Sequence, residues 1–417
     1  MKILNIALLI VFLNIISCTQ KNVPFEPNYD ESEIPDYTLP AILNDSDWET
    51  ERRPEILSLF EEEVYGKVPE FEYNLKFTML DFDSTALDGR ATRKQVNMNI
   101  SSGEQSLDAH LLIYQPAHNK LAPVFVGYNF YGNHTIHADS NILLAQSWVR
   151  NNEEFHITEN KATPESRGVR HNRWPVEMII EHDFAIATIY YGDIDPDFDD
   201  GFKNGIHSLV SDNPPTENEW GSIAAWAWGL SRAMDYFEQD PDIDHNRVIV
   251  IGHSRLGKTS LWTGASDTRF SMVVSNNSGC GGAALSRRQF GETVGRINEV
   301  FPHWFCDNYT KYNEKEDNCP VDQHMLIALI APRPVYVASA TEDQWADPKG
   351  EFLSALEADV VYKHLGRKGI KSTEMPEPDM PLDFGTIGYH IRTGKHDITA
   401  WDWQQYINFA DFHLKGK

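Results

Sequence analysis

The stretch that decides the fold is Val248-Ile249-Val250-Ile251-Gly252-His253-Ser254-Arg255-Leu256-Gly257-Lys258. Its four β-branched residues predict a buried strand, and Thr259 to Ala265 predicts a helix. Between them stands a serine with glycines on both sides, which let the backbone turn sharply. A strand, a serine in a sharp turn and a helix are typical of a nucleophile elbow, although the second glycine comes one residue later than usual.

Five other short apolar runs predict buried strands, because each is bounded by turn residues. They are Leu111 to Tyr114, Val124 to Tyr128, Phe184 to Tyr190, Met272 to Ser275 and Val335 to Ala338. Residues Trp220 to Phe237 carry apolar side chains at spacings of three and four, which predicts a helix with one buried face. Alternating strands and helices predict an α/β fold of the α/β-hydrolase type: a three-layer sandwich with a mostly parallel central sheet and helices on both faces. Sites in such sheets lie at the carboxyl ends of the strands.

A serine nucleophile needs a base and an acid that orients the base. In this fold they follow along the chain in the order serine, acid, histidine. Carboxylates come directly after the strand Val335 to Ala338, at a strand end where the acid belongs. We expect Asp343 to be this acid, with Glu342 and Asp347 as alternatives.

The histidine of such a triad is expected in the loop after the last strand. Gly394-Lys395-His396-Asp397 has this place, because the amphipathic helix Ala400 to Leu414 follows it. His390 is a rival for the same role. The order along the chain favours His396.

The 417 residues are 41% hydrophobic and 12% aromatic, enough for one large core. Lys2 and the apolar run Ile3 to Ile16 predict a signal peptide over residues 1–17, because the run is too short to span a membrane. Ile15-Ile16-Ser17-Cys18 resembles a bacterial lipobox, in which Cys18 would carry a lipid. Residues 18–40 are rich in Pro, Asp, Glu and Asn and predict a flexible tether. We expect residues 41–417 to form a single catalytic domain, monomeric and held at the bacterial cell envelope.

A formal net charge of −26 argues against a nucleic-acid partner, whose phosphates require clustered Lys and Arg. The run Asp193 to Gly201 alternates carboxylates as calcium loops do, but its glycine comes one place late and the terminal glutamate is missing. His134 and His137 lack a glutamate base and a third ligand, so a zinc site is not expected. We expect no metal and no cofactor.

One disulfide could form among three cysteines, with the pairing left open: Cys280, Cys306 and Cys319.

Several longer motifs follow the serine turn in a fixed order. They are Ser278-Gly279-Cys280-Gly281-Gly282-Ala283-Ala284-Leu285-Ser286-Arg287-Arg288, Gly291-Glu292-Thr293-Val294, Phe301-Pro302-His303-Trp304-Phe305, Trp345-Ala346-Asp347-Pro348 and Gly394-Lys395-His396-Asp397. In these motifs the chain, from about residue 45 to its end, resembles the glucuronoyl esterases, carbohydrate esterase family 15. The resemblance implies hydrolysis of the ester that joins 4-O-methyl-glucuronate on xylan to a lignin alcohol, without metal. Glucuronoxylan and lignin–carbohydrate esters would be the partners.

The resemblance also implies roles for individual residues. The nucleophile would be Ser254, the base His396, the oxyanion donor Arg255, and the sugar contacts Lys258, Glu292 and Trp345. Lys258 follows Ser254 by four residues and therefore shares its helix face.

One position departs from the family's pattern. Many members carry the acid just after the strand that follows the nucleophile helix, where this chain has Asn277. A neutral amide does not stabilise an imidazolium, so the acid is expected at Asp343 instead. Two rivals stay open: an esterase for acetyl or other carboxylic esters on the same fold, and a glycan-binding lipoprotein with weakened catalysis.

Overall fold

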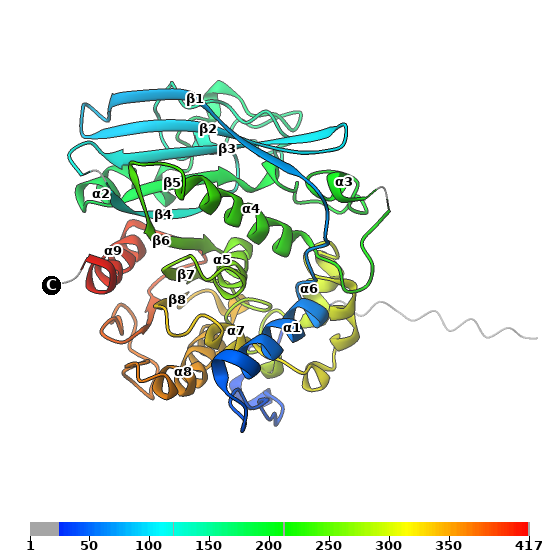
Figure 1. Ribbon diagram of the computed structural model, residues 1–417. Coiled ribbons are helices and arrows are strands. Elements are labelled where there is room, and N and C mark those ends of the chain that lie inside the picture. The colour runs from blue at the N-terminus through cyan, green and yellow to red at the C-terminus, as the bar shows by residue number, and fades with distance from the viewer. Residues whose placement is uncertain (1–24, 120, 212, 416–417) are drawn as a thin grey trace, which may run out of the picture.

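The computed structural model describes residues 25–119, 121–211 and 213–415. The expected signal peptide and Cys18 lie outside these residues. Within them, strands form one nine-stranded sheet of order β1-β2-β3-β5-β4-β6-β7-β8-β9 (Figure 1). The strands are β1 (Asn74–Ala86), β2 (Ala91–Ser102), β3 (Gln105–Pro116), β4 (Ala122–Asn129), β5 (Ala185–Tyr190), β6 (Ile243–His253), β7 (Met272–Asn276), β8 (Val335–Ala340) and β9 (Ile387–Arg392).

The sheet has an antiparallel part and a parallel part. β1, β2, β3 and β5 pair antiparallel in that order, and all pairs from β5 to β9 are parallel. The predicted α/β-hydrolase sandwich is therefore confirmed, and all six predicted strands lie in or overlap observed ones. β1 and β2 were not predicted, because neither forms a continuous apolar run. β1 is exposed or half-buried along most of its length, and β2 buries the polar side chains of Arg93, Lys94 and Gln95.

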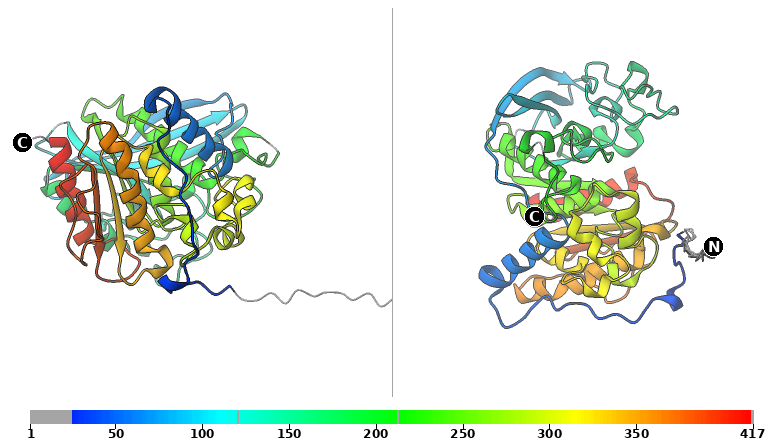
Figure 2. Two further views of the ribbon diagram at one scale, coloured as in Figure 1. Left: turned by 90° about the horizontal axis from the view of Figure 1, so that it is seen from below. Right: turned by 90° about the vertical axis from the view of Figure 1, so that its right-hand side faces the viewer.

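Helices cover both faces of the sheet (Figures 1 and 2). They are α1 (Arg53–Glu63), α2 (Val176–Glu181), α3 (His207–Val210), α4 (Ser222–Phe237), α5 (Arg255–Ser266), α6 (Val294–Val300), α7 (Gln323–Ala328), α8 (Pro348–His364) and α9 (Ala400–Ala410). Alternate residues of a central strand enter opposite cores: Val250 belongs to the core that includes side chains of α1, α4, α5, α7 and α8, whereas Ile249 belongs to the core that includes α2 and α9. This alternation explains why β6 is apolar at every position from 248 to 251.

The parallel register brings the ends of four strands to one edge of the sheet. His253 of β6 lies opposite Asn276 of β7, which lies opposite Ala338 of β8, and Ala338 lies opposite His390 of β9. The backbone N–H of Glu342 then donates to the carbonyl of Gly394, at 2.9 Å. The loops after β6, β7, β8 and β9 therefore meet at this edge.

Residues 25–40 differ from the expected tether, because they lie against the body of the protein (Figure 2). The backbone N–H of Gly291 donates to the carbonyl of Asn28 at 2.8 Å, and the Arg287 guanidinium donates to the carbonyl of Thr38 at 2.7 Å. Backbone carbonyls bind the segment to the domain, a contact that amino-acid composition does not report. Residues 18–24 lie outside the described part of the chain.

Cys280, Cys306 and Cys319 are three separate buried thiols, so the disulfide that the sequence allowed does not form among them. Burial raises the pKa of the Cys280 thiol well above its ordinary value, which makes that thiol unreactive.

Within the described residues, no helix combines the length and apolar character needed to cross a membrane.

Gly252 at the end of β6 provides a test of the sharp turn. A Cβ at this position would lie 1.8 Å from the carbonyl oxygen of Leu256, which is backbone and cannot move aside. We expect Gly252→Ala to lower the free energy of unfolding by at least about 2 kcal/mol in chemical denaturation. Gly295→Ala in α6 is the matched control, because its Cβ would meet its nearest atom at an ordinary 3.6 Å. Equal stability of the two variants would contradict the crowded turn.

Candidate active site

Ser254 occupies the turn between β6 and α5, where strand and helix are separated by this single residue. Its backbone has φ 60° and ψ −129°, a strained conformation for a residue with a side chain. The Ser254 N–H donates to the carbonyl of Asn276 at 2.9 Å, and the Ser254 carbonyl accepts from the N–H of Gly257 at 2.8 Å. These bonds hold a half-exposed hydroxyl at the N-terminus of α5, as in a nucleophile elbow.

His396 and Asp343 form a direct pair. The His396 Nδ1 lies 2.6 Å from Asp343 Oδ2, and the Asn277 side-chain N–H donates to the same carboxylate oxygen at 2.9 Å. Asp343 is 4% exposed, whereas the His396 side chain is 40% exposed. A carboxylate at Nδ1 selects the tautomer that leaves Nε2 free to accept a proton. Asn277 therefore supports the acid of the pair.

The alternatives to this pair have other surroundings. Asp347 pairs with the Arg288 guanidinium at 2.8 Å and caps the start of α8, and Glu342 is exposed. His390 is fully buried, with Nε2 2.9 Å from Asp402 Oδ1 and Nδ1 3.1 Å from the Tyr336 hydroxyl. None of these three side chains lines the cleft that contains Ser254 and His396.

Ser254, Arg255 and His396 line one open cleft. Its other walls come from Phe130, Tyr131, Asn152, Phe155, Arg170, Arg173 and His253. Aromatic rings and two arginines therefore border the side of Ser254 on which His396 lies. The cleft does not include Lys258, Glu292 or Trp345 among its walls.

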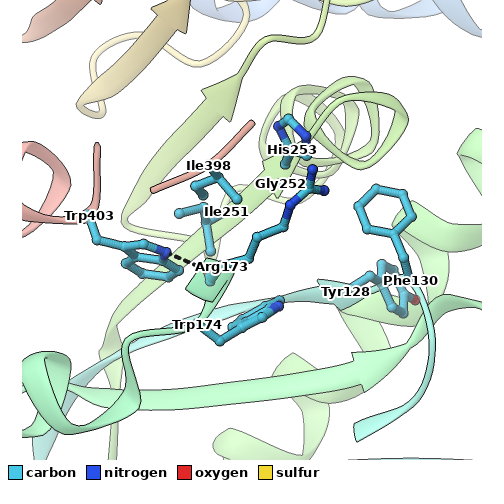
Figure 3. Close-up of a pocket in the computed structure, with 9 residues that line it drawn as sticks. All are labelled: Tyr128, Phe130, Arg173, Trp174, Ile251, Gly252, His253, Ile398 and Trp403. Atoms are coloured by element: carbon cyan, nitrogen blue, oxygen red, sulfur yellow. Dashed lines mark hydrogen bonds between the residues drawn. The ribbon is translucent and has the colours of Figure 1, made fainter. Parts of the chain in front are cut away.

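A smaller pocket adjoins this cleft next to His253, and the Arg173 side chain extends toward Gly252 and His253 there (Figure 3). The His253 ring lies 4.6 Å from the His396 ring, between centroids. Burial lowers the pKa of His253 well below its ordinary value, and the charges of His396 and Arg173 lower it further. A neutral His253 adds no positive charge beside His396, so it does not oppose protonation of that residue.

Lys258, Glu292 and Trp345 form a second group near Ser254, outside the walls of this cleft. Lys258 Nζ donates to the Ser278 carbonyl and lies 4.0 Å from Glu292 Oε2. Burial raises the pKa of Glu292, while Lys258 and a hydrogen bond from Trp345 act against this rise. Burial lowers the pKa of Lys258, and Glu292 opposes the change. The three side chains form one polar group with an exposed indole at its rim.

Arg255 is held by a buried carboxylate. Its guanidinium pairs with Asp197, whose side chain is fully buried, and stacks on the Trp304 ring with 4.6 Å to the centroid. The Nε of Arg255 is buried and has no hydrogen-bond partner within the described structure. Asp197 and Trp304 therefore fix the guanidinium, which lies beside the cleft that Arg255 lines.

Asp197 accepts five hydrogen bonds. Besides Arg255, its donors are Arg150 at 3.1 Å, the Tyr191 hydroxyl at 3.0 Å, His303 Nε2 at 3.0 Å and Trp304 Nε1 at 2.8 Å. Burial alone would raise the pKa of Asp197, but the bonds from His303 and Trp304 and the charge of Arg255 outweigh burial and hold it well below its usual range. Asp197 is therefore a buried anion.

The sequence offered Asp197 only as part of the calcium-like run. Asp195 lies 3.6 Å from His207, and Asp193 accepts from the backbone N–H of His110, so the carboxylates of this run face different partners. His134 and His137 also diverge, toward Ser166 and Glu177. Two donors to Asp197 lie in the motif Phe301 to Phe305, but nothing in the sequence relates this motif to Asp197, so the residue was missed.

Comparisons with known proteins agree with this geometry. A family model described as glucuronyl esterase, fungi, matches residues 213–366. The carbohydrate esterase MZ0003 of an unknown prokaryotic organism is 55% identical to this chain, and the match covers 93% of this chain and 92% of that protein.

Two solved structures extend the likeness to the fold. A promiscuous CE15 esterase from a marine bacterial metagenome has a TM-score of 0.87 and 55% identity, covering 93% of this chain and 100% of its own. A glucuronoyl esterase from Solibacter usitatus has a TM-score of 0.84 and 45% identity, covering 92% and 100%. The chain therefore belongs to carbohydrate esterase family 15 and is a carboxylic ester hydrolase with the α/β-hydrolase fold.

Proposed function

We propose that this protein is a glucuronoyl esterase, which hydrolyses the ester between 4-O-methyl-glucuronate on xylan and lignin alcohols. One observation carries the proposal: the His396–Asp343 pair and Ser254 border one cleft, and the group of Lys258, Glu292 and Trp345 lies beside them. The serine, histidine and aspartate suit acyl transfer. The group of Lys258, Glu292 and Trp345 offers a cation and a carboxylate, which suit the hydroxyls of a sugar ring, and an indole, which suits its apolar face.

In the proposed first step, Nε2 of His396 takes the proton of Ser254 as its Oγ attacks the uronoyl carbonyl carbon. The carbonyl π electrons move to the oxygen, and Asp343 stabilises the imidazolium. The tetrahedral intermediate collapses, the bond to the alcohol oxygen breaks, and His396 returns the proton to that oxygen. Ser254 then carries the uronoyl group as an ester.

In the second step, His396 takes a proton from water, which attacks the acyl carbon and releases the uronic acid. The proton passes back to Ser254 Oγ. In both steps the negative oxygen needs donors that are already in place, because a donor that must reorganise stabilises the transition state less. The Arg255 guanidinium, which Asp197 holds beside Ser254, is the proposed side-chain donor.

The cellular setting is part of the same proposal. The apolar run before Cys18 and its lipobox-like context support export and a lipid anchor in the cell envelope. A monomer on the outer membrane would reach glucuronoxylan and lignin–carbohydrate esters outside the cell.

A wider substrate range is the second candidate, because a relative at 55% identity is described as a promiscuous esterase. Rates on methyl glucuronate and on an aryl acetate separate the two. A glucuronoyl esterase prefers the uronate, whereas a general esterase hydrolyses both equally well.

Ser254→Ala tests the nucleophile. We expect the rate of hydrolysis of a glucuronate ester to fall by a factor of about 10⁴ or more, because no other group can form the acyl-enzyme. The thermal unfolding midpoint should stay close to that of the wild type, since no buried contact is lost. Wild-type turnover in the folded variant would refute Ser254 as the nucleophile.

Asp343→Asn tests the acid. We expect kcat to fall by a factor of about 10³ to 10⁴, because an amide stabilises neither the required tautomer nor the imidazolium. The matched control is Glu342→Gln on the same loop, whose exposed side chain should leave kcat unchanged. If Asp343→Asn keeps the wild-type rate, the acid role moves to another carboxylate.

Asp197→Asn tests the anchor of Arg255. We expect kcat to fall by a factor of about 10 to 10², with KM changed by less than about threefold, because the guanidinium would be mispositioned mainly for the transition state. Unfolding free energy should also fall, by about 3 kcal/mol, since two arginines lose their counter-charge.

The matched control is Arg150→Gln, which removes a donor whose side chain is 47% exposed and leaves the bond between Arg255 and Asp197 in place. Its kcat should stay within about twofold of the wild type. A folded Asp197→Asn variant with wild-type kcat would show that Arg255 needs no carboxylate.

A further inference from the structure

The N-terminal segment brings an additional aromatic ring to the sugar side of the site. Phe25 contacts Trp345 edge-to-face, with 6.0 Å between ring centroids, and the Arg296 guanidinium lies over the Phe25 ring at 5.3 Å. Phe25 is 36% exposed and Trp345 is 37% exposed. These two aromatic side chains are in contact and partly open to solvent, and they adjoin the polar group of Lys258 and Glu292, so a sugar ring can pack on them next to that group.

The segment is held in place on this side of the protein. The Asn28 carbonyl accepts from the N–H of Gly291, and the neighbouring Glu292 donates its backbone N–H to the Trp345 carbonyl at 3.0 Å. Tyr29 packs on Phe290, with 5.9 Å between ring centroids. The position of Phe25 is therefore coupled to the loops that carry Glu292 and Trp345.

We infer that Phe25 and Trp345 form an aromatic ledge that binds a pyranose ring of the glycan main chain, next to the uronate. This inference rests on the proposed function. Contacts run without a break from Lys258 to Glu292, from Glu292 to Trp345 and from Trp345 to Phe25. A ligand whose uronate ring binds at Lys258 and Glu292 would place its next sugar ring at Trp345 and Phe25.

We place the other half of the ester in the cleft that His396 lines. The alcohol oxygen must receive its proton from His396, and the cleft beside His396 is walled by Tyr131, Phe155 and Arg170 instead. The acyl and alcohol parts lie on different sides of the carbonyl carbon. The ledge therefore faces the glycan, whose neutral rings have apolar C–H faces that pack on aromatic side chains.

Phe25→Ala tests the ledge in the full chain with two substrates. One is the benzyl ester of a lone glucuronoside, and the other is the same ester carried on a xylo-oligosaccharide. We expect kcat/KM to fall about fivefold to tenfold on the oligosaccharide, through KM, and to stay within about twofold on the lone uronate, because one aromatic contact contributes about this factor. Phe25→Tyr, which keeps an aromatic ring, should retain the wild-type kcat/KM on the oligosaccharide.

The controls separate this inference from the proposed function. Phe384→Ala removes an exposed aromatic ring that contacts Phe412 and lies outside the site, and it should change neither substrate's kcat/KM. An equal loss on both substrates, or no loss on either, in a Phe25→Ala variant with the wild-type unfolding midpoint would overturn the ledge. Failure of the wild type to hydrolyse the lone uronate ester would instead overturn the proposed function.

Discussion

The turn at Ser254 is the constraint on which the arrangement of the site depends. A non-glycine residue at φ 60° and ψ −129° costs about 1 to 3 kcal/mol, so its surroundings must enforce this conformation. They do so from both sides. The Leu256 carbonyl packs so closely on Gly252 that a Cβ would not fit there, and the Ser254 N–H donates to the carbonyl of Asn276 on the neighbouring strand. Because the strands are parallel and in register, a turn fixed at β6 also fixes where the loops after β7, β8 and β9 lie.

Two basic side chains in this site each have a carboxylate of their own. In the proposed mechanism Asp343 stabilises the transient charge of His396, and Asp197 pairs with Arg255, whose charge is permanent. Asn277 fits this division, because its amide lies 2.9 Å from Asp343 and donates to it. A second carboxylate at that distance would repel the first and favour its protonation. The amide at this position and the acid at Asp343 are therefore compatible choices, which explains how the chain departs from the family's pattern without losing an ionised acid.

The sequence was sufficient for the central strands, because their continuous apolar runs indicated strands buried on both faces. The order of residues along the chain also led to the proposal of Ser254, Asp343 and His396, which the structure brings together at one edge of the sheet. β9 gave no such signal, because Gly388, His390 and Arg392 interrupt its apolar residues. His390 and Arg392 meet their common partner, Asp402, only in the folded chain.

Contacts between distant segments could not be predicted. Asp197 gathers donors from residues 150, 191, 255, 303 and 304, and no local spacing relates these positions. Residues 25–40 likewise have the composition of a tether, but backbone hydrogen bonds and single aromatic side chains bind them to the domain. Polar composition indicates little buried apolar surface, and it says nothing about hydrogen bonds to a neighbouring loop.

The central claim is that Ser254 is a nucleophile activated by His396 and Asp343. Covalent labelling with a fluorophosphonate, followed by mass spectrometry of the digested protein, tests it most directly. We predict one adduct per chain, on the peptide that contains Ser254, and expect it to form far more slowly in His396→Ala. An unlabelled protein, or an adduct on another residue, would show that Ser254 is not the activated nucleophile.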